Sequence, residues 1–373
     1  MITKNKSIVL IGGGTGGHAA PILAIYQKLK EISPDLNVSV FGVGSLEERY
    51  FLKDIPEYRT IFAGKLNRYL TLKNLIEAVK VFVGFFQSLY YLGIIRPTII
   101  FSKGGFTSLP MIYAARLLGI PYFFHESDIE MGKVNLLMAD KAEKIFVCFP
   151  IKKYPRLDLK KVYWSGPVLR KGFLDDKEAQ KEIFGFDNDK SIILVTGGSQ
   201  GSLHLSKNML GAAKNLLKKY NIIHQTGKFS YEYSRDFYTS LEPEFKNSYY
   251  YKEFLTNSNG QDLMLEAIDV ADVVISRSGS TIVELAVKGK NMILVPWKHA
   301  AQDHQSKNAD YFLQNDSAIV ITDDELSPHM IEASIDRIML GENPQDLGKN
   351  AQKLFPTNGL EMICEKIISK IKE

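Results

Sequence analysis

The sequence predicts an α/β protein built from two doubly wound domains, each with a parallel sheet. Short, buried-looking strands alternate with segments of helical length, a pattern typical of parallel sheets. A strand, a loop of small residues, a helix and a return strand occur in the first half, and this scheme begins again after Gly166. A chain of 373 residues is long enough for two cores of ordinary size.

The chain is organised around its first strand and the glycine run that follows. Residues 8–11 are apolar and mostly β-branched, which favours a buried strand, and residues 12–17 read Gly-Gly-Gly-Thr-Gly-Gly. Apolar residues at helical spacing then predict a helix over 21–30, with Pro21 in its first turn. Glycines before a helix N-terminus let backbone amides approach an anion, so we expect a phosphate there.

The same glycines satisfy a dinucleotide-binding pattern, which also requires an acidic residue at the tip of the second strand. That strand is expected over 38–41, and no acid stands at its tip, since Glu47 and Glu48 come several residues late. A nicotinamide or flavin enzyme is therefore a weak alternative. His18 closes the loop; a lone histidine is more often a capping or packing residue than a catalyst, and both roles stay open here.

The remaining elements follow the same alternation. The loop after the fourth strand, 103–108, contains two glycines, and Thr107 or Ser108 is expected to cap a helix that runs through Leu118. Besides the strands over 8–11 and 38–41, strands are predicted over 58–62, 97–102, 122–124, 145–149, 162–165, 191–196, 273–276 and 292–295, with a short helix in 46–56 and further helices over 72–92, 205–219 and 281–287.

The helix over 72–92 has an unusually wide apolar face. Two interpretations stay open: a helix packed between the sheet and a loop, which the residues alone favour, or an interfacial patch resting on anionic lipid. In the second case a basic rim would be formed by Lys65, Arg68, Lys73, Lys80 and Arg96. The apolar run from Val81 to Ile95 is broken by Gln87 and Ser88 and is too short to span a bilayer.

Composition narrows the class of protein. A formal net charge of +4 is too small to indicate nucleic-acid binding. Two cysteines, Cys148 and Cys364, imply no disulfide framework. The first residues contain no signal-peptide pattern, so we expect a cytoplasmic chain.

Loops in the second half carry further candidate groups. The loop 197–202, Gly-Gly-Ser-Gln-Gly-Ser, has the composition of a diphosphate site. Glu284, one turn into a helix, has the right chemistry to bind ribose hydroxyls, but a first-turn acid beside the helix dipole is equally plausible. Asp303, His304 and Gln305 are candidate sugar ligands. The His299, Asp303 and His304 spacing matches no common zinc pattern, so no metal site is expected.

Six motifs in order resemble the MurG family of glycosyltransferases. They are Gly-Gly-Thr-Gly-Gly-His, Lys-Gly-Gly-Phe, His-Glu-Ser-Asp after Gly-Ile-Pro, Gly-Gly-Ser-Gln-Gly, Ser-Arg-Ser-Gly-Ser-Thr-Ile-Val-Glu-Leu and Asp-His-Gln-Ser-Lys-Asn-Ala. The resemblance implies a GT-B fold of two Rossmann-like domains with a cleft between them. It implies an inverting hexosyltransferase that moves N-acetylglucosamine from UDP-N-acetylglucosamine to the muramoyl 4-hydroxyl of lipid I, giving lipid II for peptidoglycan.

The resemblance also implies roles for particular residues. For the reaction that it implies, His18 is the best candidate base, because an unperturbed imidazole titrates near neutral pH, and the alternative that His18 only positions the acceptor stays open. The acceptor diphosphate would lie at Gly14, Gly104 and Gly105. The donor-binding residues would be Thr15, Gly16, Gly17, Asp128, Arg170, Ser199, Leu255, Ser280, Thr281, Glu284 and Gln305. No cofactor beyond the donor is expected, and a membrane-facing patch on the first domain favours the interfacial interpretation of 72–92, hence a peripheral protein on the inner face of the cell membrane.

The expected organisation is an acceptor-binding and membrane-associating domain over 1–165, a UDP-sugar domain over 166–355 and a C-terminal helix within 356–373 that packs back on the first domain. Alternatives with similar architecture are a diacylglycerol glycosyltransferase and a UDP-N-acetylglucosamine 2-epimerase. A non-catalytic binder of nucleotide sugars would leave His18 unexplained.

Overall fold

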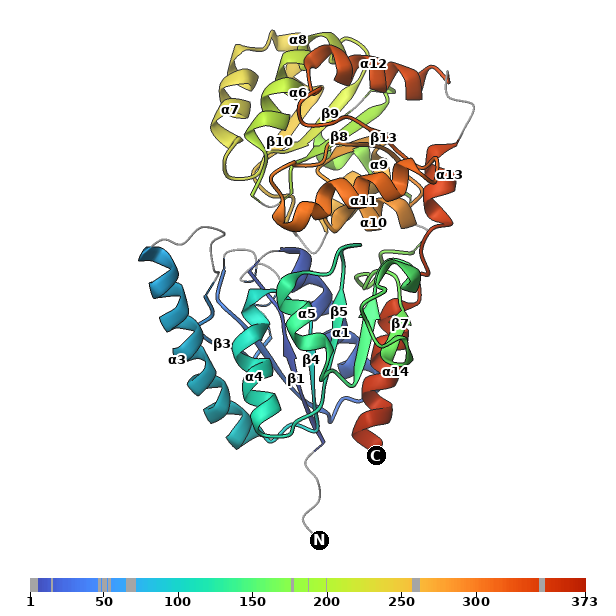
Figure 1. The fold of residues 1–373 in the computed structure, drawn as a ribbon. Helices are drawn as coiled ribbons and strands as arrows, with labels where there is room; N and C mark the ends of the chain where they lie inside the picture. Colours follow the sequence, from blue (N-terminus) through green and yellow to red (C-terminus); the bar gives the residue numbers. More distant parts are fainter. Residues whose placement is uncertain are drawn as a thin grey trace. The chain divides into compact units, whose positions relative to one another are not determined.

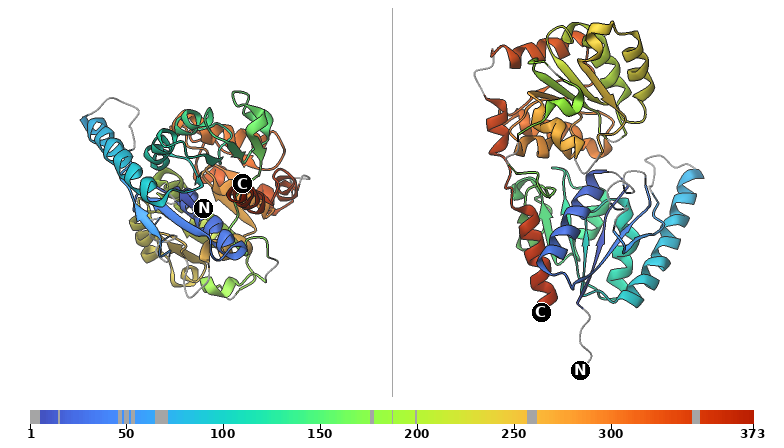
Figure 2. Two further views of the ribbon diagram at one scale, coloured as in Figure 1. Left: turned by 90° about the horizontal axis from the view of Figure 1, so that it is seen from below. Right: turned by 180° about the vertical axis from the view of Figure 1, so that it is seen from behind.

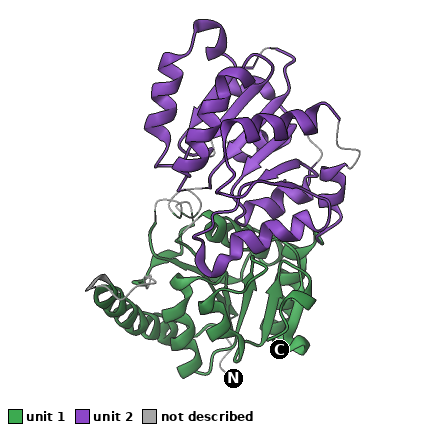
Figure 3. Ribbon diagram, turned by 45° about the horizontal axis from the view of Figure 1, so that its top comes forward, with its two compact units in different colours: residues 1–171, 356–373 green, residues 172–355 purple. Residues whose placement is uncertain are grey.

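The computed structural model describes residues 6–14, 16–45, 48, 52, 55–64, 72–175, 178–186, 188–198, 200–256, 262–341 and 346–373. They form two compact units (Figure 3): residues 1–171 with 356–373, and residues 172–355. Each unit contains one parallel sheet, so the predicted α/β class and the pair of parallel-sheet domains are confirmed.

The first unit contains a seven-stranded sheet in the order β3-β2-β1-β4-β5-β6-β7, in which β1 lies between β2 and β4. Its strands are β1 (Ser7–Ile11), β2 (Asn37–Gly42), β3 (Tyr58–Thr60), β4 (Ile99–Ser102), β5 (Tyr122–Glu126), β6 (Lys144–Val147) and β7 (Val162–Trp164). Its helices are α1 (Gly16–Ile32), α3 (Leu72–Ile95), α4 (Leu109–Leu117), α5 (Lys133–Ala139) and α14 (Gly359–Lys372), with 3₁₀ turns η1 (Phe106–Ser108), η2 (Ile151–Lys153) and η3 (Leu159–Lys161).

Helices cover both faces of this sheet. Figure 1 shows α3, α4 and α5 before it, and Figure 2 shows α1 and α14 on the opposite side. The C-terminal helix belongs to the core of this unit, because Ile363 and Ile367 are fully buried in one cluster with Ile25 of α1 and Ile8 of β1. Burying these apolar side chains is the main force that holds the last helix in place.

The second unit contains a six-stranded sheet in the order β10-β9-β8-β11-β12-β13. Its strands are β8 (Ile192–Thr196), β9 (Asn221–Gln225), β10 (Tyr249–Lys252), β11 (Val273–Ser276), β12 (Asn291–Leu294) and β13 (Ile319–Val320). Its helices are α6 (Leu203–Leu216), α7 (Tyr231–Ser240), α8 (Pro243–Lys246), α9 (Leu263–Val270), α10 (Thr281–Val287), α11 (His304–Leu313), α12 (Pro328–Met339) and α13 (Leu347–Gln352), with η4 (Lys181–Phe184) and η5 (Ala301–Asp303).

Several predicted boundaries were wrong by a few residues. Helix α1 begins at Gly16, so Pro21 lies inside the helix and not in its first turn. Ser108 occupies the N-cap position of α4 without capping it, because its hydroxyl donates to the Gly104 carbonyl at 3.0 Å. The strand predicted over 145–149 ends at Val147. The helix predicted in 46–56 lies mostly outside the described residues.

Candidate functional site

Two glycine loops lie side by side at the carboxyl edge of the first unit's sheet, because β1 and β4 are paired neighbours. A Cβ added to Gly105 would lie 3.5 Å from Nε2 of His18, and one added to Gly14 would lie 3.0 Å from the Phe106 ring. The loops predicted from sequence are therefore brought together, with His18 packed on the second loop.

His18 lies in the first turn of α1, and the pKa of its imidazole is shifted from the ordinary value. Its Nδ1 is buried and has no hydrogen-bond partner among the described residues. Burial, and secondarily the positive charge of Lys103, lower its pKa to about 4. The expected unperturbed titration near neutral pH was wrong, because burial penalises the charged imidazolium. At pH 7 the ring is neutral and one nitrogen is free to accept a proton.

Lys103 is a buried cation. It is the first residue of the Lys-Gly-Gly-Phe motif, but the motif alone did not indicate a role for it. Only 2% of the residue is exposed, and its Nζ donates to the Ser127 hydroxyl at 2.5 Å. Burial lowers the pKa of this ammonium, whereas the nearby Glu126, Cys148 and Asp128 raise it.

The second glycine loop is held by a buried polar network. The Gly104 N–H donates to the Ser102 hydroxyl at 2.9 Å, and the Gly105 N–H donates to Oδ1 of Asn135 at 3.2 Å. Asn135 in turn donates to Oε2 of Glu126 at 2.7 Å. Burial raises the pKa of the Glu126 carboxyl, while backbone N–H groups of residues 127, 128 and 132 donate to it.

The first glycine loop is held in a comparable way. The Gly14 N–H donates to Oε1 of Glu48 at 2.5 Å. All three glycines predicted to bind the acceptor diphosphate, Gly14, Gly104 and Gly105, therefore already donate their N–H groups to protein acceptors. A bound diphosphate would have to use other donors, and helix geometry leaves the N–H groups of the first turn of α1 without intrahelical acceptors.

The other residues expected in this unit are placed as follows. Gly16 and Gly17 form the first turn of α1, and Thr15 lies outside the described residues. The Asp128 N–H donates to Glu126, and its carbonyl accepts from the Tyr154 hydroxyl at 2.8 Å. Arg170 is partly buried near the end of the unit.

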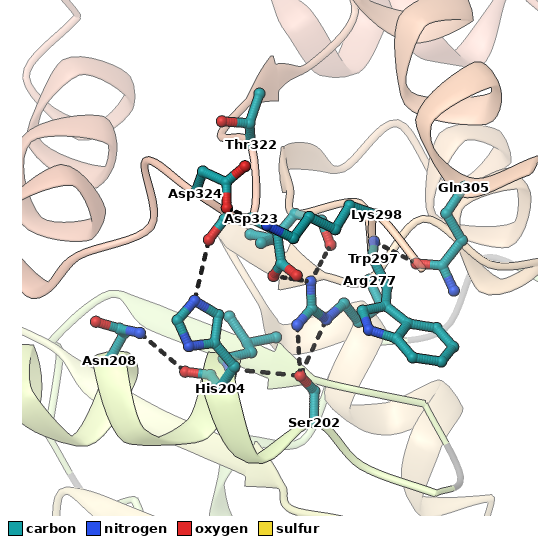
Figure 4. A network of polar contacts seen from close by, with 12 residues as sticks. Ser202, His204, Asn208, Arg277, Trp297, Lys298, Gln305, Thr322, Asp323 and Asp324 are labelled. Carbon is teal, nitrogen blue, oxygen red and sulfur yellow. Dashed lines mark hydrogen bonds and ion pairs between the residues drawn. The ribbon is translucent and has the colours of Figure 1, made fainter. Parts of the chain in front are cut away.

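In the second unit, an arginine network supports the loop before α6 (Figure 4). Nε and a terminal nitrogen of Arg277 donate to the Ser202 hydroxyl at 3.0 and 2.7 Å. The other terminal nitrogen forms an ion pair with Asp323 at 2.7 Å and donates to the Val295 carbonyl. Ser202 is also the N-cap of α6 and accepts from the Leu205 N–H. The network fixes the start of α6; Ser199, in the loop before it, lies outside the described residues.

The remaining donor candidates surround the carboxyl ends of β9 to β12. Leu255 is buried and its N–H donates to the Gln225 side chain at 3.2 Å. Ser280 holds the N-cap position of α10 without a capping bond, and Thr281 and Glu284 lie in its first turn. Oε1 of Gln305 accepts from the Trp297 N–H at 2.9 Å, which Figure 4 shows.

Helix α3 exposes a broad apolar surface. Its outward side chains are Leu75, Ile76, Val79, Phe82, Val83, Phe86, Tyr90 and Ile94, each between 39% and 67% exposed. Among the described residues, one helical stretch, Asn74–Ile95, is long and apolar enough to cross a membrane by length and composition, so the apolar stretch is longer than the run predicted over 81–95. An apolar cavity of about 330 Å³ lies between α3 and α4, lined by residues that include Phe85 and Pro110.

Of the expected basic rim, Lys80 is paired with Glu77 at 2.6 Å and Arg96 is exposed; Lys65, Arg68 and the Lys73 side chain lie outside the described part.

Within the described residues, no group of three or more His, Cys, Asp or Glu is arranged to hold a metal ion. Sequence reasoning missed the anchoring residues Glu48, Lys103, Asn135 and Arg277. Glu48 was considered only for the acid of a dinucleotide-binding pattern and was set aside there, and the other three stand in or near recognised motifs without a periodic signal of their own.

Comparisons with known proteins identify the family of the chain. The chain matches the glycosyltransferase family 28 N-terminal domain over residues 8–147 and the C-terminal domain over 192–361. It is 34% identical to a Clostridium tetani protein over 97% of each chain, and 32% identical to a Clostridium kluyveri protein over 87% of this chain and 89% of that one. Both relatives are named UDP-N-acetylglucosamine–N-acetylmuramyl-(pentapeptide) pyrophosphoryl-undecaprenol N-acetylglucosamine transferase.

Solved structures share the fold at low identity. The MurG structure from Acinetobacter baumannii matches with a TM-score of 0.69 and 22% identity, over 98% of this chain and 99% of that one. A structure titled UDP-N-acetylglucosamine 2-epimerase matches with a TM-score of 0.68 and 12% identity, over 98% and 96%. The shared fold therefore does not separate transferase from epimerase; the sequence relatives do.

Proposed function

This chain belongs to glycosyltransferase family 28, and because the N-acetylglucosamine transferases named above are its relatives, we propose that it transfers N-acetylglucosamine from UDP-N-acetylglucosamine to lipid I. The acceptor group is the 4-hydroxyl of the muramoyl sugar on undecaprenyl diphosphate, and the product is lipid II for peptidoglycan. The observation that carries the proposal is 34% identity to such a transferase over 97% of both chains.

The donor is assigned to the second unit. Glu284 in the first turn of α10 would accept hydrogen bonds from the ribose hydroxyls, and Gln305 would contact the sugar. The carbonyl of Leu255 is suited to accept from the uracil N3–H, since the N–H of Leu255 already donates to Gln225. The other proposed donor-binding residues of this unit are Ser199, Ser280 and Thr281. The N-terminus of α6 would favour the negative charge of the donor diphosphate.

The acceptor diphosphate is assigned to the N-terminus of α1 in the first unit. The N–H groups of Gly16, Gly17 and His18 belong to the unsatisfied first turn of a 17-residue helix. Gly14, Gly104 and Gly105 then shape the loops rather than donate to the ligand, because their N–H groups are already donated. Thr15, Asp128 and Arg170 keep their proposed role as donor-binding residues.

Inverting transfer requires one proton to leave the acceptor hydroxyl as it attacks C1 of the donor sugar. The neutral imidazole of His18 would accept that proton while the bond between C1 and the UDP oxygen breaks and UDP leaves with the electron pair. The developing negative charge on UDP is stabilised by preorganised helix N-terminal amides. No metal cofactor is part of the proposal, and a rate unchanged by EDTA would support that.

The apolar face of α3 is proposed to rest on the cytoplasmic membrane surface, which would bring the enzyme to an acceptor carried on a lipid. Eight large apolar side chains exposed on one helix are hard to reconcile with a fully solvated surface. A peripheral location on the inner face of the membrane follows.

The test is a product assay with UDP-N-acetylglucosamine and one of three additions: lipid I, diacylglycerol or no acceptor. The proposal expects UDP release and a disaccharide product with lipid I alone. Transfer only to diacylglycerol would reassign the acceptor. Release of free sugar and UDP without any acceptor would indicate an epimerase.

A further inference from the structure

Glu48 is a fully buried carboxylate that accepts from four hydrogen-bond donors within the part of the chain that the structure describes. Its exposed fraction is 0%. Oε2 accepts from the N–H groups of Val43 and Gly44 at 2.8 and 2.9 Å and from the Tyr58 hydroxyl at 2.7 Å. Among the described residues, the donor to Oε1 is the Gly14 N–H. One side chain therefore joins the end of β2 to the first glycine loop.

The surrounding glycines leave the space that this carboxylate occupies. A Cβ added to Gly13 would collide with the carboxylate from the side of the first loop, and a Cβ added to Gly42 would collide with it from the side of β2. Two glycines of the fold are thus accounted for by the buried side chain and not by a ligand.

The loop that Glu48 holds leads directly into the proposed acceptor site. Gly14 is followed two residues later by the start of α1, whose first turn contains His18. Gly14 has a φ of +86°, a conformation that glycine adopts readily but that does not by itself select one loop shape. A hydrogen bond to a buried charge supplies that selection.

We propose that Glu48 is a positioning residue for the transfer reaction, holding the first glycine loop in the shape that the acceptor diphosphate and His18 require. The inference rests on the proposed function, because the acceptor site it organises is the one assigned there. Glu48 touches no reacting atom in this scheme; it acts through the Gly14 N–H.

The asymmetry of its contacts gives a selective variant. In Glu48→Gln, the amide oxygen takes the position of Oε2 and still accepts from the Val43 N–H, the Gly44 N–H and the Tyr58 hydroxyl. The amide NH₂ group then takes the position of Oε1 and faces the Gly14 N–H. Two donors then face each other, and only the bond to the glycine loop is lost. Tyr58→Phe is the matched control, since it removes one bond to the same carboxylate and leaves the Gly14 bond in place.

The experiment measures KM for lipid I and for UDP-N-acetylglucosamine in the full-length wild type and both variants. E48Q is expected to raise the acceptor KM about tenfold, as for loss of one hydrogen bond to a charged group, with the donor KM changed less than twofold. Y58F is expected to change the acceptor KM less than twofold while losing thermal stability. Equal acceptor KM values in E48Q and Y58F, with equal losses of stability, would assign Glu48 a structural role and overturn the proposal.

Amide hydrogen exchange in the wild type tests the same contact without activity. The Gly14 N–H is expected to be protected as strongly as those of Val43 and Gly44, and to lose protection selectively in E48Q. Fast exchange at Gly14 in the wild type would refute the contact whether or not lipid I is the acceptor. A wild type inactive on lipid I but protected at Gly14 would instead refute the proposed function.

Discussion

Replacing Lys103 by methionine should move the acid limb of the pH–rate profile to higher pH. Lys103 is buried beside the glycine loops, and its positive charge is the second cause, after burial, of the low pKa of His18. Methionine keeps the site dry and removes the charge. The imidazolium then becomes less unfavourable, and the pKa of His18 rises.

The expected size follows from the pKa of about 4, about 2.5 units below the ordinary value of 6.5. Lys103 is the smaller of the two causes that lower it, so its removal should restore part of this difference. A rise of one unit, for example, would lower the neutral fraction of His18 at pH 4.5 from about 76% to about 24%. At pH 5.5 the wild type would keep about 97% of its base in the active form, against about 9% for an unperturbed histidine.

The assay is kcat/KM for lipid I between pH 4.5 and 8.5 at constant ionic strength, with circular dichroism at each pH to confirm that the chain is folded. Lys103→Arg serves as the control that keeps a positive charge. Superimposable acid limbs in wild type and K103M would show that Lys103 does not act on the base. A wild-type limb centred near pH 6.5 would show that the base is not a desolvated His18.

The remaining predictions concern the base, the ion pair, the membrane face and acid stability. His18→Ala should lose most turnover while UDP-N-acetylglucosamine still binds by calorimetry; an equal loss of donor affinity would show a positional role. Arg277→Met should cost about 3–5 kcal/mol in urea unfolding, because it leaves the buried Asp323 carboxylate unpaired, and a loss below 1 kcal/mol would contradict the buried pairing. Phe82→Ser should reduce sedimentation with anionic vesicles and leave unfolding unchanged, and unaltered sedimentation would remove α3 from the membrane contact. Burial lowers the pKa of His224 to about 3, so the unfolded chain takes up the proton first, and stability present above pH 6.5 is lost as pH falls toward 3, by about 5 kcal/mol from this group. His224→Gln should flatten that loss in unfolding free energy measured against pH.

The strands that carry the site could be predicted from the sequence because parallel strands buried on both faces are continuous apolar runs. Residues 8–11 and 273–276 are such runs, and both were placed to within a residue. The strands over 221–225 and 249–252 were not predicted. The second reads Tyr-Tyr-Tyr-Lys and lies at the edge of its sheet, where amphipathic tyrosines replace the aliphatic run on which the prediction depended.

Only those parts of the candidate site that belong to recognisable sequence motifs could be predicted. Glycine loops and His18 were found because their composition is unusual next to a strand end. Their hydrogen-bond partners were not found, since Asn135 lies 30 residues from Gly105 and Arg277 lies 75 from Ser202. Contacts of that range depend on which strands become neighbours, and strand order was not part of the sequence prediction.

The occupied amides of the glycine loops change how such motifs are interpreted. A glycine-rich turn before a helix is usually assigned to phosphate binding through its own N–H groups. Here the Gly14 N–H donates to Glu48 and the Gly105 N–H donates to Asn135, so these glycines provide close approach and backbone conformation, and the proposed anion site is the helix end. Because buried side chains fix the loops before any ligand arrives, little ordering remains to be done on binding, and a preorganised site loses less affinity to ordering than a flexible one. Weakening an anchor should therefore act on acceptor binding and not on donor binding, the separation that the Glu48 variants measure.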